Sequence, residues 1–241
     1  RSTLFPYTTL FRSQPLARVD KLANGLRVLR LPVEQVESVS AIAMVKAGSR
    51  YETPTTYGVA HFLEHMVFKG TKKYPNNRVI SQTLDGVGAA YNAFTSEEST
   101  VFYVQAAAAN LDLAIKMVGQ MTTSALIEEE EINRERGVIL EEIHMYADQP
   151  DAFNANIFNQ MFYRGCGIAH DILGTHETVK AMKRESFFQF LDTWYGATNM
   201  LVVIAGKKNV VMSSDTLKQV EAAFVFPQSR QQSPDQCQLR G

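Results

Sequence analysis

The sequence predicts an α+β fold in which a mixed or antiparallel sheet is covered by helices. Two observations lead to this fold class. Short runs rich in branched apolar residues, typical of strands, are interleaved with longer segments whose apolar residues recur at helical spacing. The chain also has 241 residues and 45% hydrophobic content, enough for a sizeable globular core.

The first predicted elements are two strands and a helix. The strands cover Leu26 to Leu31 and Ser38 to Val45, and the polar stretch between them suggests that they form an antiparallel pair. The helix covers Thr56 to Phe68, because its apolar residues recur at helical spacing and Gly70 follows as a stop signal.

Helices and strands then alternate to the end of the folded part. In chain order we expect a helix at Asn76 to Leu84, strands at Ala90 to Thr95 and Thr100 to Gln105, helices at Leu111 to Ser124, Glu128 to Ala147, Ala152 to Phe162 and Arg184 to Trp194, a strand at Met200 to Ala205 and a helix at Thr216 to Phe224.

Both ends of the chain have a different character. Leu4 to Ser13 repeats Thr-Leu-Phe without an amphipathic period, so residues 1–13 are interpreted as a translated sequencing adapter or a flexible tail. Residues 228–241 are rich in Ser, Gln and Pro and are interpreted as a linker to a further domain. Residues 14–227 are therefore expected to form the folded domain.

Composition excludes several function classes. A net charge of −1 without a basic block argues against nucleic-acid binding, and no apolar run approaches the ~20 residues of a membrane span. Two cysteines, Cys166 and Cys237, are too few for a disulfide framework. We expect a soluble protein, cytoplasmic rather than periplasmic or organellar, with its compartment undetermined because the native N-terminus is not visible.

One short motif carries metal chemistry. His61-Phe62-Leu63-Glu64-His65 places two imidazoles four residues apart, so both project from one face of a helix and can bind one ion. The alternative is a pair of surface or core histidines with Glu64 as a solvated neighbour. A hydrolytic zinc site also needs a third protein ligand from another part of the chain.

The predicted helix at Glu128 to Ala147 can supply that ligand. At about 100° per residue, Ile132, Ile139, Ile143 and Tyr146 share an inward stripe. Glu135 and Glu142 border this stripe, whereas Glu141 lies on the opposite face. Carboxylates buried at an apolar border need a cation or a donor, although an acidic edge that stays in water remains an alternative.

The sequence resembles the pitrilysin or insulinase family of zinc peptidases, the inverzincins with the motif H-x-x-E-H, and within it the mitochondrial processing peptidases and their bacterial relatives. The segments that carry the resemblance are GVAHFLEHMVFKGT at Gly58 to Thr71, NAFTSEEST at Asn92 to Thr100, ERGVILEE at Glu135 to Glu142, LGTHETVKAM at Leu173 to Met182 and YGATNMLVVIAG at Tyr195 to Gly206. The resemblance implies the N-terminal catalytic half of a clamshell metallohydrolase.

It also implies roles for individual residues. His61, His65 and Glu142 would bind one Zn²⁺, and Glu64 would be the general base acting on a zinc-activated water. Glu135 would orient a ligand from outside the coordination sphere. Asn92, Ala93 and Phe94 would lie beside the substrate backbone.

The function implied is that of a zinc-dependent metalloendopeptidase acting on extended or unfolded peptides. Its partners would be the peptide substrate and a homologous second half, in the same polypeptide or in a partner subunit, with a dimer as a further possibility and inactivity without that half. One alternative is a non-catalytic core subunit of the same fold. Another is an enzyme of the S-ribosylhomocysteine lyase type, which needs a cysteine as its third ligand, and both cysteines here are poorly placed for that.

Overall fold

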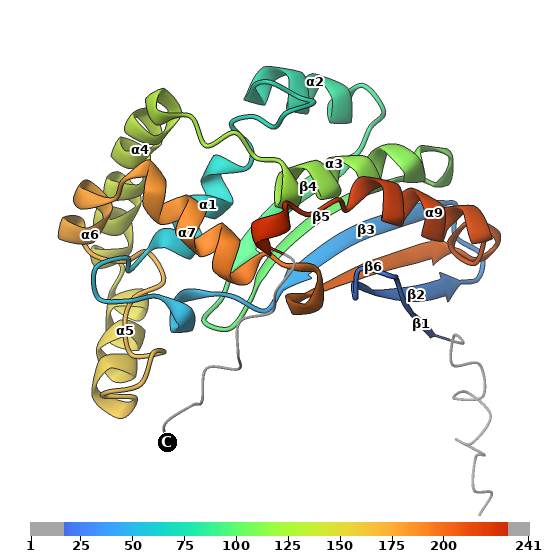
Figure 1. The fold of residues 1–241 in the computed structure, drawn as a ribbon. Helices are drawn as coiled ribbons and strands as arrows, with labels where there is room; N and C mark the ends of the chain where they lie inside the picture. The colour runs from blue at the N-terminus through green and yellow to red at the C-terminus, as the bar shows by residue number, and fades with distance from the viewer. Residues whose placement is uncertain (1–16, 231–241) are drawn as a thin grey trace, which may run out of the picture.

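The computed structural model describes residues 17–230, whose centre is one six-stranded mixed sheet in the order β1-β2-β6-β3-β5-β4 (Figure 1). The strands are β1 (Arg18–Lys21), β2 (Arg27–Val33), β3 (Ser38–Val45), β4 (Ala90–Thr95), β5 (Thr100–Ala107) and β6 (Met200–Lys207). β2 and β6 run parallel, and every other neighbouring pair is antiparallel. The predicted α+β class is confirmed.

The predicted antiparallel pairing of the first two long strands is wrong. β6 lies between β2 and β3, parallel to the former and antiparallel to the latter. The connection between β2 and β3 is long enough to span the two strand spacings, about 9–10 Å, that the insertion requires. β6 is mostly apolar, and a strand with partners on both sides has all its backbone groups paired. β1 is short, polar and at the sheet edge, and it was not predicted.

Nine α-helices surround the sheet within the described residues. They are α1 (Val59–Met66), α2 (Asn77–Asp85), α3 (Leu111–Thr123), α4 (Glu129–Ala147), α5 (Pro150–Phe162), α6 (His176–Ala181), α7 (Arg184–Trp194), α8 (Lys208–Val211) and α9 (Ser214–Ala223). Short 3₁₀ turns occupy Ser49–Tyr51, Ala108–Asn110, Ala197–Asn199 and Gln228–Arg230. None of the helices in this range is long and apolar enough to cross a membrane.

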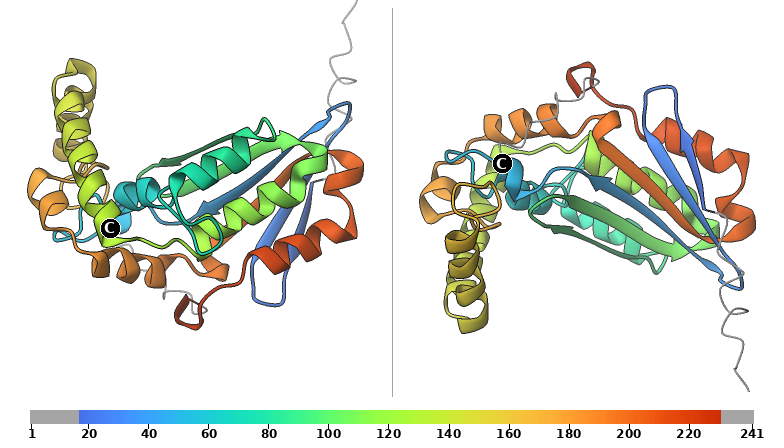
Figure 2. Two further views of the ribbon diagram at one scale, coloured as in Figure 1. Left: turned by 90° about the horizontal axis from the view of Figure 1, so that it is seen from above. Right: turned by 90° about the horizontal axis from the view of Figure 1, so that it is seen from below.

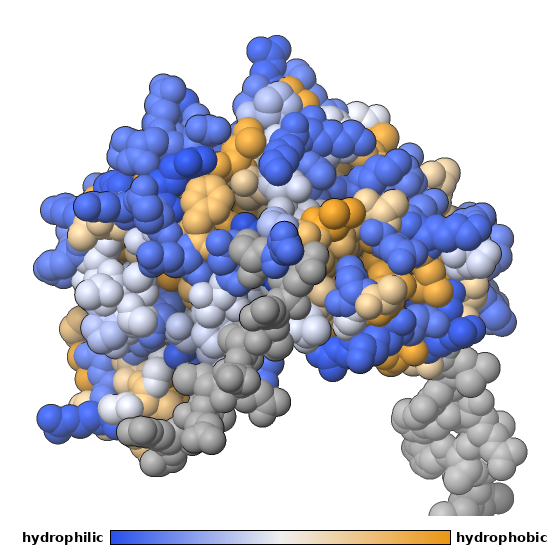
Figure 3. Space-filling view, viewed as in Figure 1, coloured by the Kyte–Doolittle hydropathy of each residue, from blue (hydrophilic) through white to orange (hydrophobic). Residues whose placement is uncertain are grey.

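The core lies between one face of the sheet and the helices. Along β3, Val39, Ala41, Ala43 and Val45 are buried while the residues between them are more exposed, the alternation of a sheet covered on one side. α3 packs on β3 and β5, and α9 lies beside α3. Figure 2 shows these helices on one face of the sheet and α1 and α4 to α7 gathered beyond one end of it. Most of the surface seen in Figure 3 is hydrophilic, with apolar residues in separate patches.

All the predicted helices are present, most of them with shifted ends. α1 begins at Val59, because Gly58 has a φ of 91° and acts as its N-cap. α6 was not predicted; it is short and begins with a capping box at Thr175. The predicted leader at residues 1–13 lies outside the described residues. Of the predicted linker at residues 228–241, only Gln228–Arg230 is described, as a 3₁₀ turn. Arg230 itself is buried, and its Nε donates to Asp192 at 3.0 Å, so the packed region reaches this residue.

Candidate metal centre

The start of α1 is held by a buried carboxylate. Oε2 of Glu52 accepts the N–H of Gly58 and Oε1 accepts the N–H of Ala60, each at 2.8 Å, which satisfies donors that the helix itself leaves unpaired. Nε2 of His170 lies 3.1 Å from the same carboxylate. Burial raises the pKa of Glu52, although these hydrogen bonds oppose the shift. The first turn of α1, which carries His61, is thereby fixed.

His61 and His65 project from one face of α1, as predicted, with ring centroids 4.6 Å apart. His61 is buried and its Nδ1 has no hydrogen-bond partner among the described residues. Burial, and then the charge of His65, lower the pKa of His61 to about 3. The imidazole is therefore neutral at physiological pH, which is the form that binds metal ions.

Glu142 of α4 faces both imidazoles. Its Oε2 lies 3.8 Å from Nε2 of His61 and 3.7 Å from Nε2 of His65, and the three donor atoms lie within 4.8 Å of one another. These separations are too long for hydrogen bonds. They suit three atoms that share one ion at the 2.0–2.2 Å typical of zinc ligation, and two imidazoles with a carboxylate are a donor set that zinc accepts. The residues present therefore fit a zinc ion.

Glu64 lies on the same helix but faces β4 and the cavity. One of its oxygens, Oε2, accepts a hydrogen bond of 2.6 Å from the hydroxyl of Thr95 on β4. Burial raises the pKa of Glu64, the Thr95 hydrogen bond and the charge of His65 lower it, and the charge of Glu142 raises it, with a raised pKa as the result. Thr95 was not among the predicted site residues.

Glu135, predicted to orient a ligand, contacts His65. It is buried on α4, and its Oε1 lies 2.9 Å from Nδ1 of His65. Its Oε2 pairs with Nζ of Lys69 at 2.5 Å. Burial alone would raise the pKa of Glu135, but the hydrogen bonds and charges of His65 and Lys69 together lower it. Lys69 was missed, because it follows the end of α1 and its contact with α4 leaves no local pattern in the sequence.

The predicted substrate segment is divided between two faces of β4. Among the described residues, β4 is the edge strand of the sheet opposite β1. The side chain of Phe94 is 51% exposed and lines the cavity, whereas Ala93 is buried on the core side. Asn92 is exposed, and its Oδ1 accepts the N–H of Ala93 at 2.9 Å.

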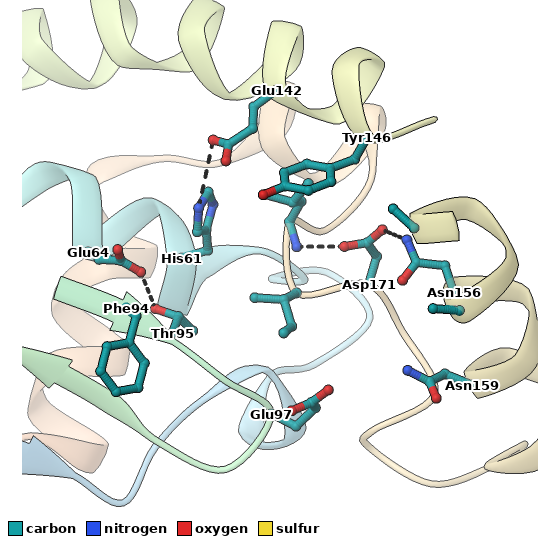
Figure 4. A pocket seen from close by; sticks show the side chains of 14 residues that line it. His61, Glu64, Phe94, Thr95, Glu97, Glu142, Tyr146, Asn156, Asn159 and Asp171 are labelled. Atoms are coloured by element: carbon teal, nitrogen blue, oxygen red, sulfur yellow. Dashed lines mark hydrogen bonds and ion pairs between the residues drawn. The ribbon is translucent and has the colours of Figure 1, made fainter. Parts of the chain in front are cut away.

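A cavity of about 520 Å³ joins these groups (Figure 4). His61, Glu64 and Glu142 lie at one side of it. Residues that the sequence did not indicate complete the wall, namely Thr95, Glu97, Tyr146, Ala152, Ala155, Asn156, Asn159, Asp171, Ile172 and Leu173. Many of them come from α5 and the loop before α6, segments without a recognisable motif. Of the three candidate zinc ligands, His61 and Glu142 line this cavity, and His65 lies behind them on α1.

Comparison with known proteins agrees with this geometry. The model of the insulinase family, peptidase family M16, matches residues 28–176. An uncharacterized zinc protease of Rickettsia bellii is 36% identical over 206 residues, which cover 86% of this chain and 49% of that protein. The probable mitochondrial-processing peptidase subunit beta of Arabidopsis thaliana is 32% identical over 212 residues, covering 88% and 39%.

A solved structure gives the same result for the fold. The first half of the periplasmic protease PqqL from Escherichia coli superposes with a TM-score of 0.80 and 26% identity, over 92% of this chain and 48% of that one. The chain therefore spans about half the length of the relatives it matches, or less. Since the family model covers more than half of the sequence, and both ligand helices fall inside the match, the chain belongs to the insulinase family, peptidase family M16.

Proposed function

We propose that the complete protein is a zinc-dependent metalloendopeptidase that hydrolyses peptide bonds in extended or unfolded peptides. One observation carries this proposal. The donor atoms of His61, His65 and Glu142 converge within 4.8 Å, and His61 and Glu142 line the same cavity of about 520 Å³ as the carboxylate of Glu64.

His61, His65 and Glu142 would hold Zn²⁺, which supplies a Lewis acid that polarises a carbonyl and acidifies water. Glu64 would accept the proton of the water whose oxygen attacks the scissile carbonyl carbon. It would then give this proton to the amine nitrogen as the carbon–nitrogen bond breaks. Its raised pKa suits both steps, because an acid–base catalyst works best when its pKa approaches the operating pH.

The substrate would lie as an added strand along β4. An edge strand offers unpaired backbone groups, and strand addition recognises a peptide backbone with little regard for its side chains. The Ala93 N–H now donates to Asn92 Oδ1. When the Asn92 side chain moves away, this N–H would donate to a carbonyl of the substrate backbone instead. Phe94 would contact a substrate side chain from the cavity wall.

The chain covers only about half the length of its relatives, which supports a second, homologous half, in the same polypeptide or in a partner subunit. We expect the 241-residue chain alone to bind zinc but to turn over little peptide. Adding the second half should restore turnover, measured with a fluorogenic unstructured peptide.

Two alternatives are less well supported. A non-catalytic core subunit would not need Glu64 and Thr95 to line one cavity with His61 and Glu142. A lyase of the S-ribosylhomocysteine type needs a cysteine ligand. Cys166 is exposed and is not part of the metal-binding cluster found among the described residues, whereas Glu142 occupies the third position.

The decisive experiment uses the full-length protein and a fluorogenic unstructured peptide. Glu64→Gln should retain one zinc and lose about 10²–10⁴ in kcat, the usual contribution of a general base. His61→Ala should lose the zinc. The matched control is Glu141→Gln, whose exposed side chain lies on the other side of α4 and whose kcat should be unchanged. Undiminished turnover by Glu64→Gln would overturn the mechanism.

A further inference from the structure

A second pair of histidines meets outside the cavity. His144 of α4 and His176, the first residue of α6, place their Nε2 atoms 2.8 Å apart, with ring centroids 4.6 Å apart. The side chain of His144 is 55% exposed. Neither residue lines the cavity that contains Glu64, although His176 lines a neighbouring one of about 650 Å³.

This pair is separate from the first metal-binding cluster. His144 follows Glu142 by two positions, or about 200° around α4, so the two side chains leave opposite sides of the helix. His176 belongs to another element than His61 and His65. An ion held by His144 and His176 would therefore be additional to the zinc.

We propose that His144 and His176 form a second, bidentate site for a divalent transition-metal ion, with water completing its coordination. Imidazole nitrogen suits ions such as Cu²⁺, Ni²⁺ and Zn²⁺. Oε1 of Glu141 lies 3.9 Å from Nδ1 of His144, too far for a hydrogen bond but near enough to add negative charge beside the pair.

The distance between the nitrogens indicates which ions fit best. With bonds of about 2.0 Å, two nitrogens 2.8 Å apart subtend roughly 90° at the metal. That angle is typical of the square-planar and tetragonal sites of Cu²⁺ and Ni²⁺, whereas tetrahedral zinc favours wider angles. The site should therefore prefer Ni²⁺ or Cu²⁺ over Zn²⁺.

Such an ion would reinforce an existing connection between α4 and α6. Arg136 of α4 already donates to the backbone carbonyls of Val179, Lys180 and Met182 at the other end of α6. A bound ion would add a second link at the first residue of α6, in the part of α4 that follows Glu142. Because the unfolded chain does not hold the two histidines together, ion binding would raise the melting temperature.

The test uses tag-free, full-length protein loaded with zinc, and Ni²⁺ as the probe. Calorimetric titration, with zinc content followed by elemental analysis, should show one equivalent of Ni²⁺ bound while zinc is retained, together with a rise in Tm. His144→Ala and His176→Ala should each lose the Ni²⁺ equivalent and the rise in Tm, yet keep the zinc and the basal peptidase activity. Zinc retention in these variants also shows that they are folded.

Two controls make the assignment specific. Met145→Ala changes an exposed neighbour on the same turn of α4 and should bind Ni²⁺ as the wild type does. Cys166→Ser removes the exposed thiol near the adjacent cavity and should also leave binding unchanged. The proposal is overturned if the zinc-loaded wild type binds no Ni²⁺, or if the Ni²⁺ equivalent survives in both histidine variants. The contact would then be only an N–H···N hydrogen bond.

Discussion

At the scale of single residues, contacts with neighbouring side chains hold His65 and Glu64 of the candidate centre in position. Nδ1 of His65 is held by Glu135, and Glu135 is held in turn by Lys69. This chain of contacts turns Nε2 of His65 toward Glu142. Glu64 is held from the opposite side by Thr95. His65 and Glu64 of the α1 motif thus each have one partner that sets the orientation of the side chain.

Loss of the Glu135 carboxylate should weaken metal binding. Glu135→Ala frees the His65 ring and leaves Lys69 without its partner, so we expect zinc affinity to fall by about 10–100-fold. Competition with a chromophoric chelator measures this change. Glu131→Ala, one helical turn earlier on α4, is the control and should bind zinc normally. Equal affinities for the two variants would show that Glu135 does not orient His65.

Loss of the Thr95 hydroxyl should affect turnover more than zinc or substrate binding. A hydrogen bond to a charged group contributes about 1.5–3 kcal/mol, so Thr95→Val should lower kcat by about tenfold or more. KM and zinc content should change little, and Thr95→Ser should recover most of kcat. Steady-state kinetics on the full-length enzyme measures the effect, and a variant that loses zinc instead would assign Thr95 a structural role.

At the scale of elements, local patterns predicted more than long-range pairing. The residues of α1 and α4 carry clear helical periods, so the common face of His61 and His65 and the inward border that carries Glu142 followed from about 100° per residue. The position of β6 between β2 and β3 could not be predicted in this way, because pairing between segments so far apart in sequence leaves no local pattern. The cavity wall from α5 and the loop before α6 was missed for the same reason.

Replacing glycine by alanine should have opposite effects on stability at Gly58 and at Gly137. Gly58 has a φ of 91°, and a Cβ there would lie 2.5 Å from the carbonyl oxygen of Leu173. Gly58→Ala should therefore lower the free energy of unfolding by at least about 1–2 kcal/mol, the cost of left-handed backbone alone. Gly137, exposed within α4 and with no atom within 4 Å of its Cβ position, is the matched control. Gly137→Ala should raise stability by about 0.5–1 kcal/mol, measured by urea unfolding.

At the scale of the whole molecule, the candidate metal centre would add a link between parts of the fold that already pack together, since Ile132 and Ile139 of α4 and Val179 of α6 belong to the common core. α1 lies beside the sheet edge formed by β4, and α4 runs beyond the end of the sheet toward α5 (Figure 1). The ligands come from both helices, so a bound ion would tie the group of α4, α5 and α6 to the body that contains the sheet. The centre is expected to be structural as well as catalytic.

Removal of zinc should therefore lower the stability of the domain. An ion that binds only the folded state adds about 2.7 kcal/mol when its free concentration is 100 times its dissociation constant. For a domain of this size, 1 kcal/mol corresponds to about 2–4 °C, so chelation should lower Tm by about 5–11 °C. His61→Ala, which lacks a ligand, should melt near the chelated wild type and respond little to chelator. Differential scanning calorimetry measures Tm with and without chelator. If the two values for the wild type are the same, the ion does not connect α1 to α4, because a link between two folded parts must stabilise them against unfolding.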